Sequence, residues 1–197
     1  MGRLDDAEQV PAETAAAWRT WLAAHHKRLD GVWLVSWRKH SGRPAMSYDE
    51  AVCEALRVGW VDSVPRRLDE DRTMLYFAPR KPGSGWSAPN KERVERLESQ
   101  GRMKAAGARV VAAARADGSW SKLDAVEALE VPDDLAAALE LRPTAREQFD
   151  AFPRSARRGI LEWIGSAKRP ETRAKRVTET AELAQRGERA NQWRPSR

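Results

Sequence analysis

The chain of 197 residues contains one cysteine, Cys53. A single thiol excludes an internal disulfide framework and a zinc site built from several thiolates. Long apolar runs are also missing, because no stretch approaches the roughly 18 residues of a membrane-spanning helix. The N-terminal residues lack the apolar segment of a secretory signal, so the expected location is the cytoplasm.

Recognisable catalytic motifs are absent as well. The three histidines, His25, His26 and His40, have no metal-ligand spacing. No Ser-His-Asp arrangement, zinc motif or dinucleotide-binding fingerprint is present. We therefore expect no catalytic residue, no bound metal and no cofactor. An enzyme of unknown reaction stays open as an alternative.

Charge is abundant and unevenly distributed. Charged residues make up 32% of the chain, hydrophobic residues 41%, and the formal net charge is +6. Residues 168–197 hold nine Lys and Arg against four Asp and Glu, a net charge of +5, and residues 80–104 have a net charge of +4. Residues 119–150 carry a net charge of −5. Basic segments can attract nucleic acid or small anions, and they are equally typical of a solvated Arg-rich surface.

Local patterns in the first half predict alternating helices and strands. The first ten residues are polar and are expected to be frayed. Ser47 and Glu50 have the spacing of a capping box, which predicts that a helix begins there. The order is helix, strand, helix, strand, strand, and it predicts an α+β unit around a small, mostly antiparallel sheet. The strands are expected at 32–37, 61–68 and 73–78.

The second half of the sequence has a purely helical pattern. Helices are expected at 87–101, 104–117, 122–129, 133–141, 143–152, 155–167 and 171–186. We expect residues 1–118 to form the α+β unit and residues 119–197 to form a C-terminal bundle of short helices packed on it. The two parts are expected to behave as one cooperative domain.

The loop over residues 79–90 is the first candidate site. Arg80 and Lys81 precede glycines and a helix that begins near Ser87. Backbone amides and the positive dipole end of a helix favour an anion there, and an Arg can hold phosphate or carboxylate with two hydrogen bonds. Trp86 could stack on a planar ligand, and Asn90 lies in the first helical turn. The alternative is a well-capped crossover whose Trp86 packs on the sheet.

The segment over residues 168–176 is the second candidate. Lys168 and Arg169 precede a helix on which Arg173 and Arg176 share a face. One basic cleft would form if this helix packed beside the Arg80 loop. The alternative is an ordinary basic surface helix.

Two further residues complete the predicted cleft. Trp60 is expected to line it together with Trp86, although most of the nine tryptophans should be core residues. Asp62 could act as a general base, but an ion pair with Arg80 is the favoured role. Cys53 is expected to be buried and inert.

Several of these segments together resemble the YdeI/OmpD-associated (OmdA) family, whose members are also called bacteriocin-protection proteins. The resemblance runs from about residue 18 to residue 187. The segments that carry it are 31–34, 47–52, 55–63, 77–81, 86–90, 101–103 and 163–176. Arg57 departs from the pattern, since the family resemblance leads us to expect a cysteine there.

The resemblance implies a role in stress or in resistance to antimicrobial peptides and bacteriocins, and it supplies no catalytic residues. Together with the basic cleft, it leads to the hypothesis of a non-catalytic cytosolic protein that binds an anionic or planar small ligand. The alternatives are a nucleic-acid-binding module that uses the basic C-terminal helix and exposed tryptophans, or an enzyme of unknown reaction.

Overall fold

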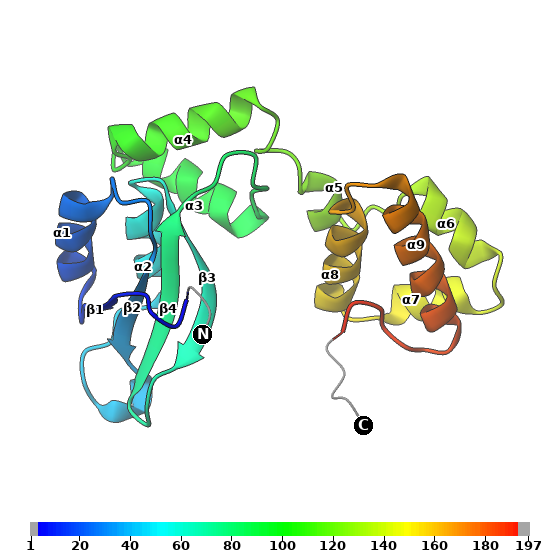
Figure 1. The fold of residues 1–197 in the computed structure, drawn as a ribbon, viewed down its shortest axis with the longest axis horizontal. Coiled ribbons are helices and arrows are strands. Elements are labelled where there is room, and N and C mark those ends of the chain that lie inside the picture. Colours follow the sequence, from blue (N-terminus) through cyan, green and yellow to red (C-terminus); the bar gives the residue numbers. More distant parts are fainter. Residues whose placement is uncertain (1–3, 193–197) are drawn as a thin grey trace. The chain divides into compact units, whose positions relative to one another are not determined.

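A computed structural model of the chain describes residues 4–192 (Figure 1). It divides into two compact units, which we call unit 1 (residues 1–122) and unit 2 (residues 123–197). Unit 1 contains a mixed sheet with helices, and unit 2 contains helices only among its described residues. The α+β fold class predicted from the sequence is therefore confirmed.

The sheet of unit 1 has four strands in the order β1-β2-β4-β3. Its strands are β1 (Gln9–Pro11), β2 (Val32–Trp37), β3 (Trp60–Arg67) and β4 (Arg72–Pro79). β4 pairs antiparallel with both β2 and β3, as a mostly antiparallel sheet requires, and β1 pairs parallel with β2. The predicted bounds of β2 agree with the structure, and those of β3 and β4 differ by one residue at each end.

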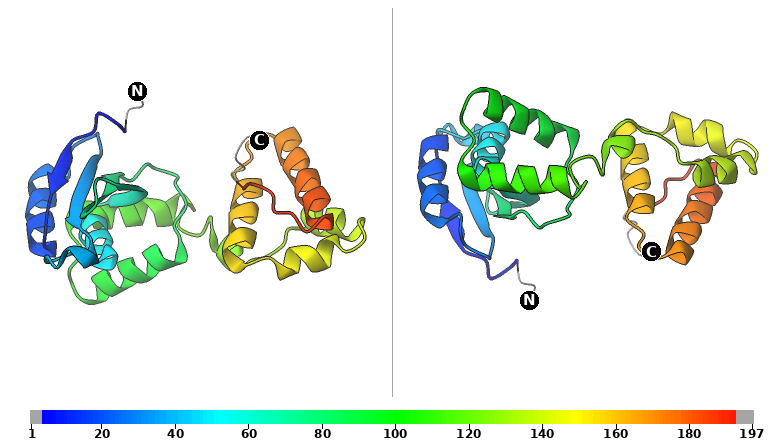
Figure 2. Two further views of the ribbon diagram at one scale, coloured as in Figure 1. Left: turned by 90° about the horizontal axis from the view of Figure 1, so that it is seen from below. Right: turned by 90° about the horizontal axis from the view of Figure 1, so that it is seen from above.

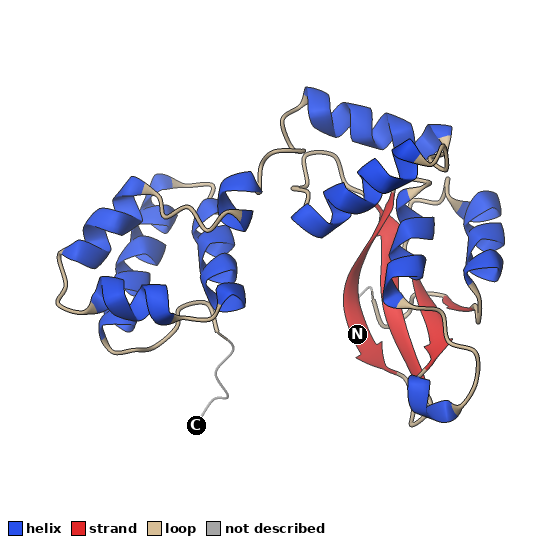
Figure 3. Cartoon of the chain, turned by 180° about the vertical axis from the view of Figure 1, so that it is seen from behind, coloured by secondary structure: helices blue, strands red, loops and turns tan. Residues whose placement is uncertain are grey.

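The helices of unit 1 cover one face of this sheet (Figure 3). They are α1 (Ala15–His25), α2 (Tyr48–Leu56), α3 (Ala88–Ser99) and α4 (Ala105–Ala116), with a short 3-10 helix η1 (Lys39–Ser41). Their apolar sides meet the sheet in one cluster whose largest members are buried aromatics: Trp18, Trp60, Phe77 and Trp86. Burial of side chains of this size supplies most of the driving force for folding.

Helix α2 begins as the sequence predicts. Ser47 accepts a hydrogen bond from the backbone of Glu50, whose carboxylate accepts one from the backbone of Ser47, so the capping box is formed. All six residues from 51 to 56 are buried, and Cys53 is 6% exposed. The predicted burial of the only thiol is confirmed.

The expectation that the first ten residues are frayed is wrong for the described part of that segment. Residues 9–11 form β1, and Val10 is buried. The indole Nε1 of Trp33 donates to the carbonyl oxygen of Leu4 at 2.7 Å. Trp33 lies outside the cluster beneath the helices, and its ring also packs against Tyr76 and under the Arg66 guanidinium, so it is 1% exposed.

Unit 2 is a bundle of short helices (Figure 2). They are α5 (Asp124–Glu127), α6 (Asp133–Glu140), α7 (Ala145–Ala151), α8 (Arg154–Gly165) and α9 (Pro170–Gln185). Their buried side chains form a second cluster, centred on residues such as Leu139, Phe149, Ile160 and Ala181. No described residue belongs to both clusters. The single cooperative domain expected from the sequence stays a prediction.

Helices in the described part of the chain are too short or too polar to cross a bilayer.

Candidate functional site

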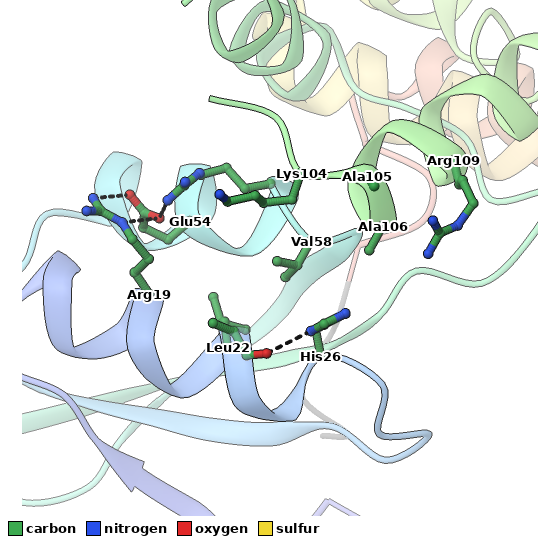
Figure 4. A pocket seen from close by; sticks show the side chains of 11 residues that line it. Arg19, Leu22, His26, Glu54, Val58, Lys104, Ala105, Ala106 and Arg109 are labelled. Carbon is green, nitrogen blue, oxygen red and sulfur yellow. Dashed lines mark hydrogen bonds and ion pairs between the residues drawn. The ribbon is translucent and has the colours of Figure 1, made fainter. Parts of the chain in front are cut away.

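A pocket of about 300 Å³ lies in unit 1 where α1, the end of α2 and the start of α4 meet (Figure 4). We call it the Glu54 pocket. Its apolar lining residues are Leu22, Ala23, Val58, Ala105 and Ala106. Its charged and polar lining residues are Arg19, His26, Glu54, Arg57, Lys104 and Arg109. An apolar lining with a few convergent polar groups is the usual character of a small-molecule site, and this volume is at the lower end of the usual range.

Among the described residues, Glu54 is the only carboxylate that lines this pocket, and it is 2% exposed. Arg19 binds it through two hydrogen bonds, Nε to Oε2 at 3.0 Å and Nη2 to Oε1 at 2.8 Å. Arg102 Nη2 donates to Oε1 at 3.0 Å, and Arg57 Nη1 donates to Oε2. Burial acts to raise the pKa of Glu54, but the hydrogen bonds and charges of Arg19 and Arg57 outweigh it and lower the pKa. Glu54 is therefore a structural anion that holds three guanidinium groups in place.

Two glycines allow the backbone to build this corner. A Cβ atom on Gly107 would lie 2.4 Å from the carbonyl oxygen of Arg57, so only glycine lets α4 pack so closely on the end of α2. Gly59 has a φ of +85°, which lets the chain leave α2 and enter β3. The backbone N–H of Lys104 donates to the carbonyl of Arg57 at 3.1 Å and connects the start of α4 to the end of α2.

The rim of the Glu54 pocket is positively charged. Figure 4 shows Arg19 and Glu54 at one end of the pocket, His26 and Arg109 at the other, and Lys104 between them. Neither Lys104 nor Arg109 has a carboxylate partner among residues 4–192. Four cationic side chains thus line the pocket with one carboxylate, which Arg102 also neutralises. This arrangement attracts an anion and leaves two cationic groups able to contact it.

The structure places Arg80 and Trp86 in direct contact. The Arg80 guanidinium lies 3.7 Å from the centroid of the Trp86 ring, and Arg80 Nη2 donates to the carbonyl oxygens of Ser84, at 3.4 Å, and Gly85. Trp86 is 1% exposed and packs against Trp120. Its ring therefore has no free face for stacking on a planar ligand.

The other residues of the Arg80 loop have different surroundings. Lys81 is exposed. Ser87 is the N-cap residue of α3, as predicted, but its side chain makes no capping hydrogen bond. Asn90 is buried and its side-chain oxygen accepts from Arg93 Nη1 at 3.1 Å. Asn90 therefore stabilises α3.

Trp60 and Asp62 lie on β3 and have separate roles. Trp60 is fully buried, and its Nε1 donates to the carbonyl of His26 at 3.0 Å. Asp62 accepts a hydrogen bond from the hydroxyl of Tyr48 at 2.7 Å, and it forms no ion pair with Arg80 within the described chain. Burial, with the Asp62 hydrogen bond, raises the pKa of Tyr48 to about 12. Tyr48 and Asp62 line a groove of about 810 Å³ between the sheet and the start of α2.

The C-terminal cations of the predicted cleft belong to unit 2. Arg173 forms a two-point ion pair with Asp134, at 2.7 and 2.9 Å. Arg176 lies 4.8 Å from the ring centroid of Trp163 and donates to its carbonyl oxygen. Lys168 and Arg169 are exposed. A cleft that joins these residues to the Arg80 loop stays a prediction.

Sequence reasoning missed Glu54 and its arginine partners. Arg19, Glu54 and Arg102 are far apart in the sequence, and their pattern matches no known motif. One signal was available, because Glu54 is a single carboxylate inside the otherwise apolar segment 51–56. A carboxylate in the middle of a buried helix requires cationic partners.

Metal binding has no candidate residues in the part of the chain that the structure describes. Residues 4–192 contain no group of three or more His, Cys, Asp or Glu side chains placed to hold an ion.

Comparison with protein families divides the chain in a similar way to the fold. A family model described as a domain of unknown function, DUF8412, matches residues 10–110. The chain belongs to the DUF8412 family. A second model, described as bacteriocin-protection, YdeI or OmpD-associated (OmdA), matches residues 128–187. No curated protein and no solved structure matches the chain.

The resemblance to the OmdA family is thus confirmed for the C-terminal part of this DUF8412 chain. The OmdA match lies within unit 2, whereas the Glu54 pocket and the Arg80 loop lie within unit 1. The resembling segments between residues 31 and 103 fall in the DUF8412 match.

Proposed function

We propose that unit 1 is a non-catalytic binding module for a small anion with an apolar body. The observation that carries this proposal is the cationic rim of the Glu54 pocket, where Lys104 and Arg109 have no carboxylate partner within the described chain. The apolar residues below the rim suit a hydrocarbon or aromatic body. The oxygens of Glu54 are occupied by guanidinium groups, so this carboxylate is poorly suited to accept a proton from a substrate.

Binding of a planar aromatic carboxylate, 2-naphthoate, tests the proposal. Isothermal titration of the full chain with 2-naphthoate is expected to give saturable binding, and the neutral analogue 2-naphthalenemethanol should bind more weakly. Replacing both rim cations, Lys104→Gln with Arg109→Gln, should weaken 2-naphthoate binding about tenfold, since two exposed charges contribute roughly 1.4 kcal/mol together. The variant Ala106→Trp fills the pocket and should abolish binding.

The control for this experiment has the same change in net charge. Lys168→Gln with Arg169→Gln removes two exposed cations from unit 2, within the second candidate segment. This variant should bind 2-naphthoate as the unmodified chain does. If it loses binding and the Lys104 and Arg109 variant does not, the ligand site includes the basic segment 168–176.

We further propose that ligand binding serves protection against bacteriocins or other antimicrobial peptides in the cytoplasm. The support is the description of the family that matches residues 128–187. Cells that produce the chain should survive a higher bacteriocin concentration than cells that lack it, and the Lys104 and Arg109 variant should lose this advantage. Equal survival in a panel of bacteriocins would contradict the protective role and leave the binding result unaffected.

A further inference from the structure

The Arg80 guanidinium is a partly buried cation that has no carboxylate partner among residues 4–192. It is half-buried beneath the loop of residues 81–85, and no Asp or Glu lies within ion-pair distance of it in the described chain. Burial lowers its pKa to about 10, and the more distant charge of Asp62 offsets only part of this effect. A desolvated cation usually has a compensating anion close to it.

Two orphaned hydrogen-bond donors occur at the same place. Among the described residues, three buried side-chain nitrogens have no hydrogen-bond acceptor: Arg80 Nε, Trp86 Nε1 and Arg157 Nε. The first two belong to side chains that stack on each other. Buried donors are satisfied in the great majority of native structures, so two orphans together indicate an acceptor that is not part of this chain.

The two residues that carry these donors also line a small cavity. It has a volume of about 80 Å³. Residues of the Arg80 loop line it together with residues from α4 and the turn after it: Arg80, Lys81, Pro82, Gly83, Ser84, Trp86, Val110, Ala113, Ala114, Asp117 and Ser119. Asp117 also lines it, but its carboxylate accepts from the backbone N–H of Ser119 at 2.8 Å. Hydrogen bonds from Ser119 lower the pKa of Asp117, and the charge of Lys122 lowers it further. Two cations, Arg80 and Lys81, therefore line this cavity with one carboxylate, that of Asp117.

We propose that this cavity binds a small oxoanion such as inorganic phosphate, held by Arg80, Lys81 and the indole N–H of Trp86. Arg80 contributes charge and its free Nε–H, Lys81 contributes a second charge, and Trp86 contributes a neutral donor. The volume admits an inorganic ion but not an apolar body, so this site is separate from the Glu54 pocket and does not depend on the proposed function.

Equilibrium dialysis of the full chain against inorganic phosphate tests this proposal. We expect saturable binding of one phosphate per chain at constant ionic strength, and a rise in the thermal midpoint with the logarithm of phosphate concentration. Arg80→Gln should weaken binding about tenfold or more, as expected for the loss of a charge-assisted hydrogen bond. Arg80→Lys keeps the charge but loses the Nε–H donor and should bind with intermediate strength.

The chain offers a matched control in Arg43. Its guanidinium also stacks on a tryptophan, 4.6 Å from the ring centroid of Trp37, but Arg43 is exposed. Arg43→Gln should bind phosphate as the unmodified chain does. Phosphate also stabilises any folded protein because it is excluded from the protein surface. The rise in thermal midpoint of Arg43→Gln includes this general effect, so comparison with Arg80→Gln isolates the part that is due to binding at the cavity.

Three outcomes would overturn the site. The first is that no saturable phosphate binding is found, in which case the cavity holds only water. The second is equal binding by folded Arg80→Gln and by Arg43→Gln. The third outcome applies if Arg80→Gln does not fold. In that case Lys81→Gln and Trp86→Phe are the deciding variants, and unchanged phosphate binding in both would overturn the site. Loss of 2-naphthoate binding in these variants is not expected, so the two sites can fail independently.

Discussion

Glu54→Gln is expected to lower the free energy of unfolding of unit 1 by about 3 kcal/mol, because removal of one partner from a buried ion pair leaves an uncompensated charge. The side chain of Arg57 is 10% exposed and loses its anion, while those of Arg19 and Arg102 are 48% and 44% exposed and can be solvated. Urea unfolding followed by circular dichroism at neutral pH measures the difference.

The matched control for Glu54 is an exposed ion pair of the same unit. Glu98 accepts from Arg115 Nη2 at 2.9 Å, and its side chain is 34% exposed. Glu98→Gln should cost less than about 1 kcal/mol, as surface ion pairs usually do. Equal effects of Glu98→Gln and Glu54→Gln would mean that the buried cluster has no special role in stability.

The loss of stability in Glu54→Gln is expected to become smaller as the pH falls. The pKa of Glu54 is lower in the folded chain than in the unfolded chain, where it is about 4.3. Its stabilising contribution is therefore complete above the unfolded pKa and is lost as the pH falls through the folded pKa. The difference in stability between Glu54→Gln and the unmodified chain should shrink as the pH falls below about 4. A difference that grows in this range would contradict the direction of the shift.

Phe149→Ala is expected to remove about 3 to 5 kcal/mol from the stability of unit 2, because Phe149 is fully buried at the centre of its core. For a unit of this size the loss is a large share of the total stability. Phe152 and Leu161 belong to the same cluster. Since the clusters of the two units share no described residue, we expect Phe149→Ala to shift the transition of unit 2 and leave that of unit 1 in place.

Differential scanning calorimetry of the full chain distinguishes this result from the single cooperative domain expected from the sequence. Two transitions, of which only one moves in Phe149→Ala, would support independent units. One transition that moves as a whole would support a single cooperative domain. Phe149→Leu gives a milder change at the same position, so the comparison survives if Phe149→Ala does not fold.

Most of the fold could be predicted because its signals are local. The capping box of Ser47 and Glu50 marks the start of α2, and Gly118, with a φ of +77°, follows the end of α4. Strand β1 was missed for a physical reason. It has three residues, of which only Val10 is buried, and its pairing with β2 depends on tertiary contacts that no local pattern encodes.

The candidate site was harder to predict because it is assembled from distant segments. Arg80 and Trp86 lie six residues apart, and the sequence does point to that loop as an anion site. The Glu54 pocket joins α1, α2 and α4, so its charges become neighbours only in the folded unit. Charge counts along the chain cannot show that Glu54 compensates three arginines while Lys104 has no carboxylate partner among residues 4–192.

The most direct test of the proposed function is to locate a bound ligand by NMR. Addition of 2-naphthoate to the isotopically labelled full chain should shift backbone amide signals of residues that line the Glu54 pocket, with Val58, Ala105 and Ala106 foremost. The shifts should saturate, and they should be smaller with 2-naphthalenemethanol at the same concentration. Shifts confined to residues 168–176, or no saturable shifts at the Glu54 pocket, would contradict the assignment of this pocket as the ligand site.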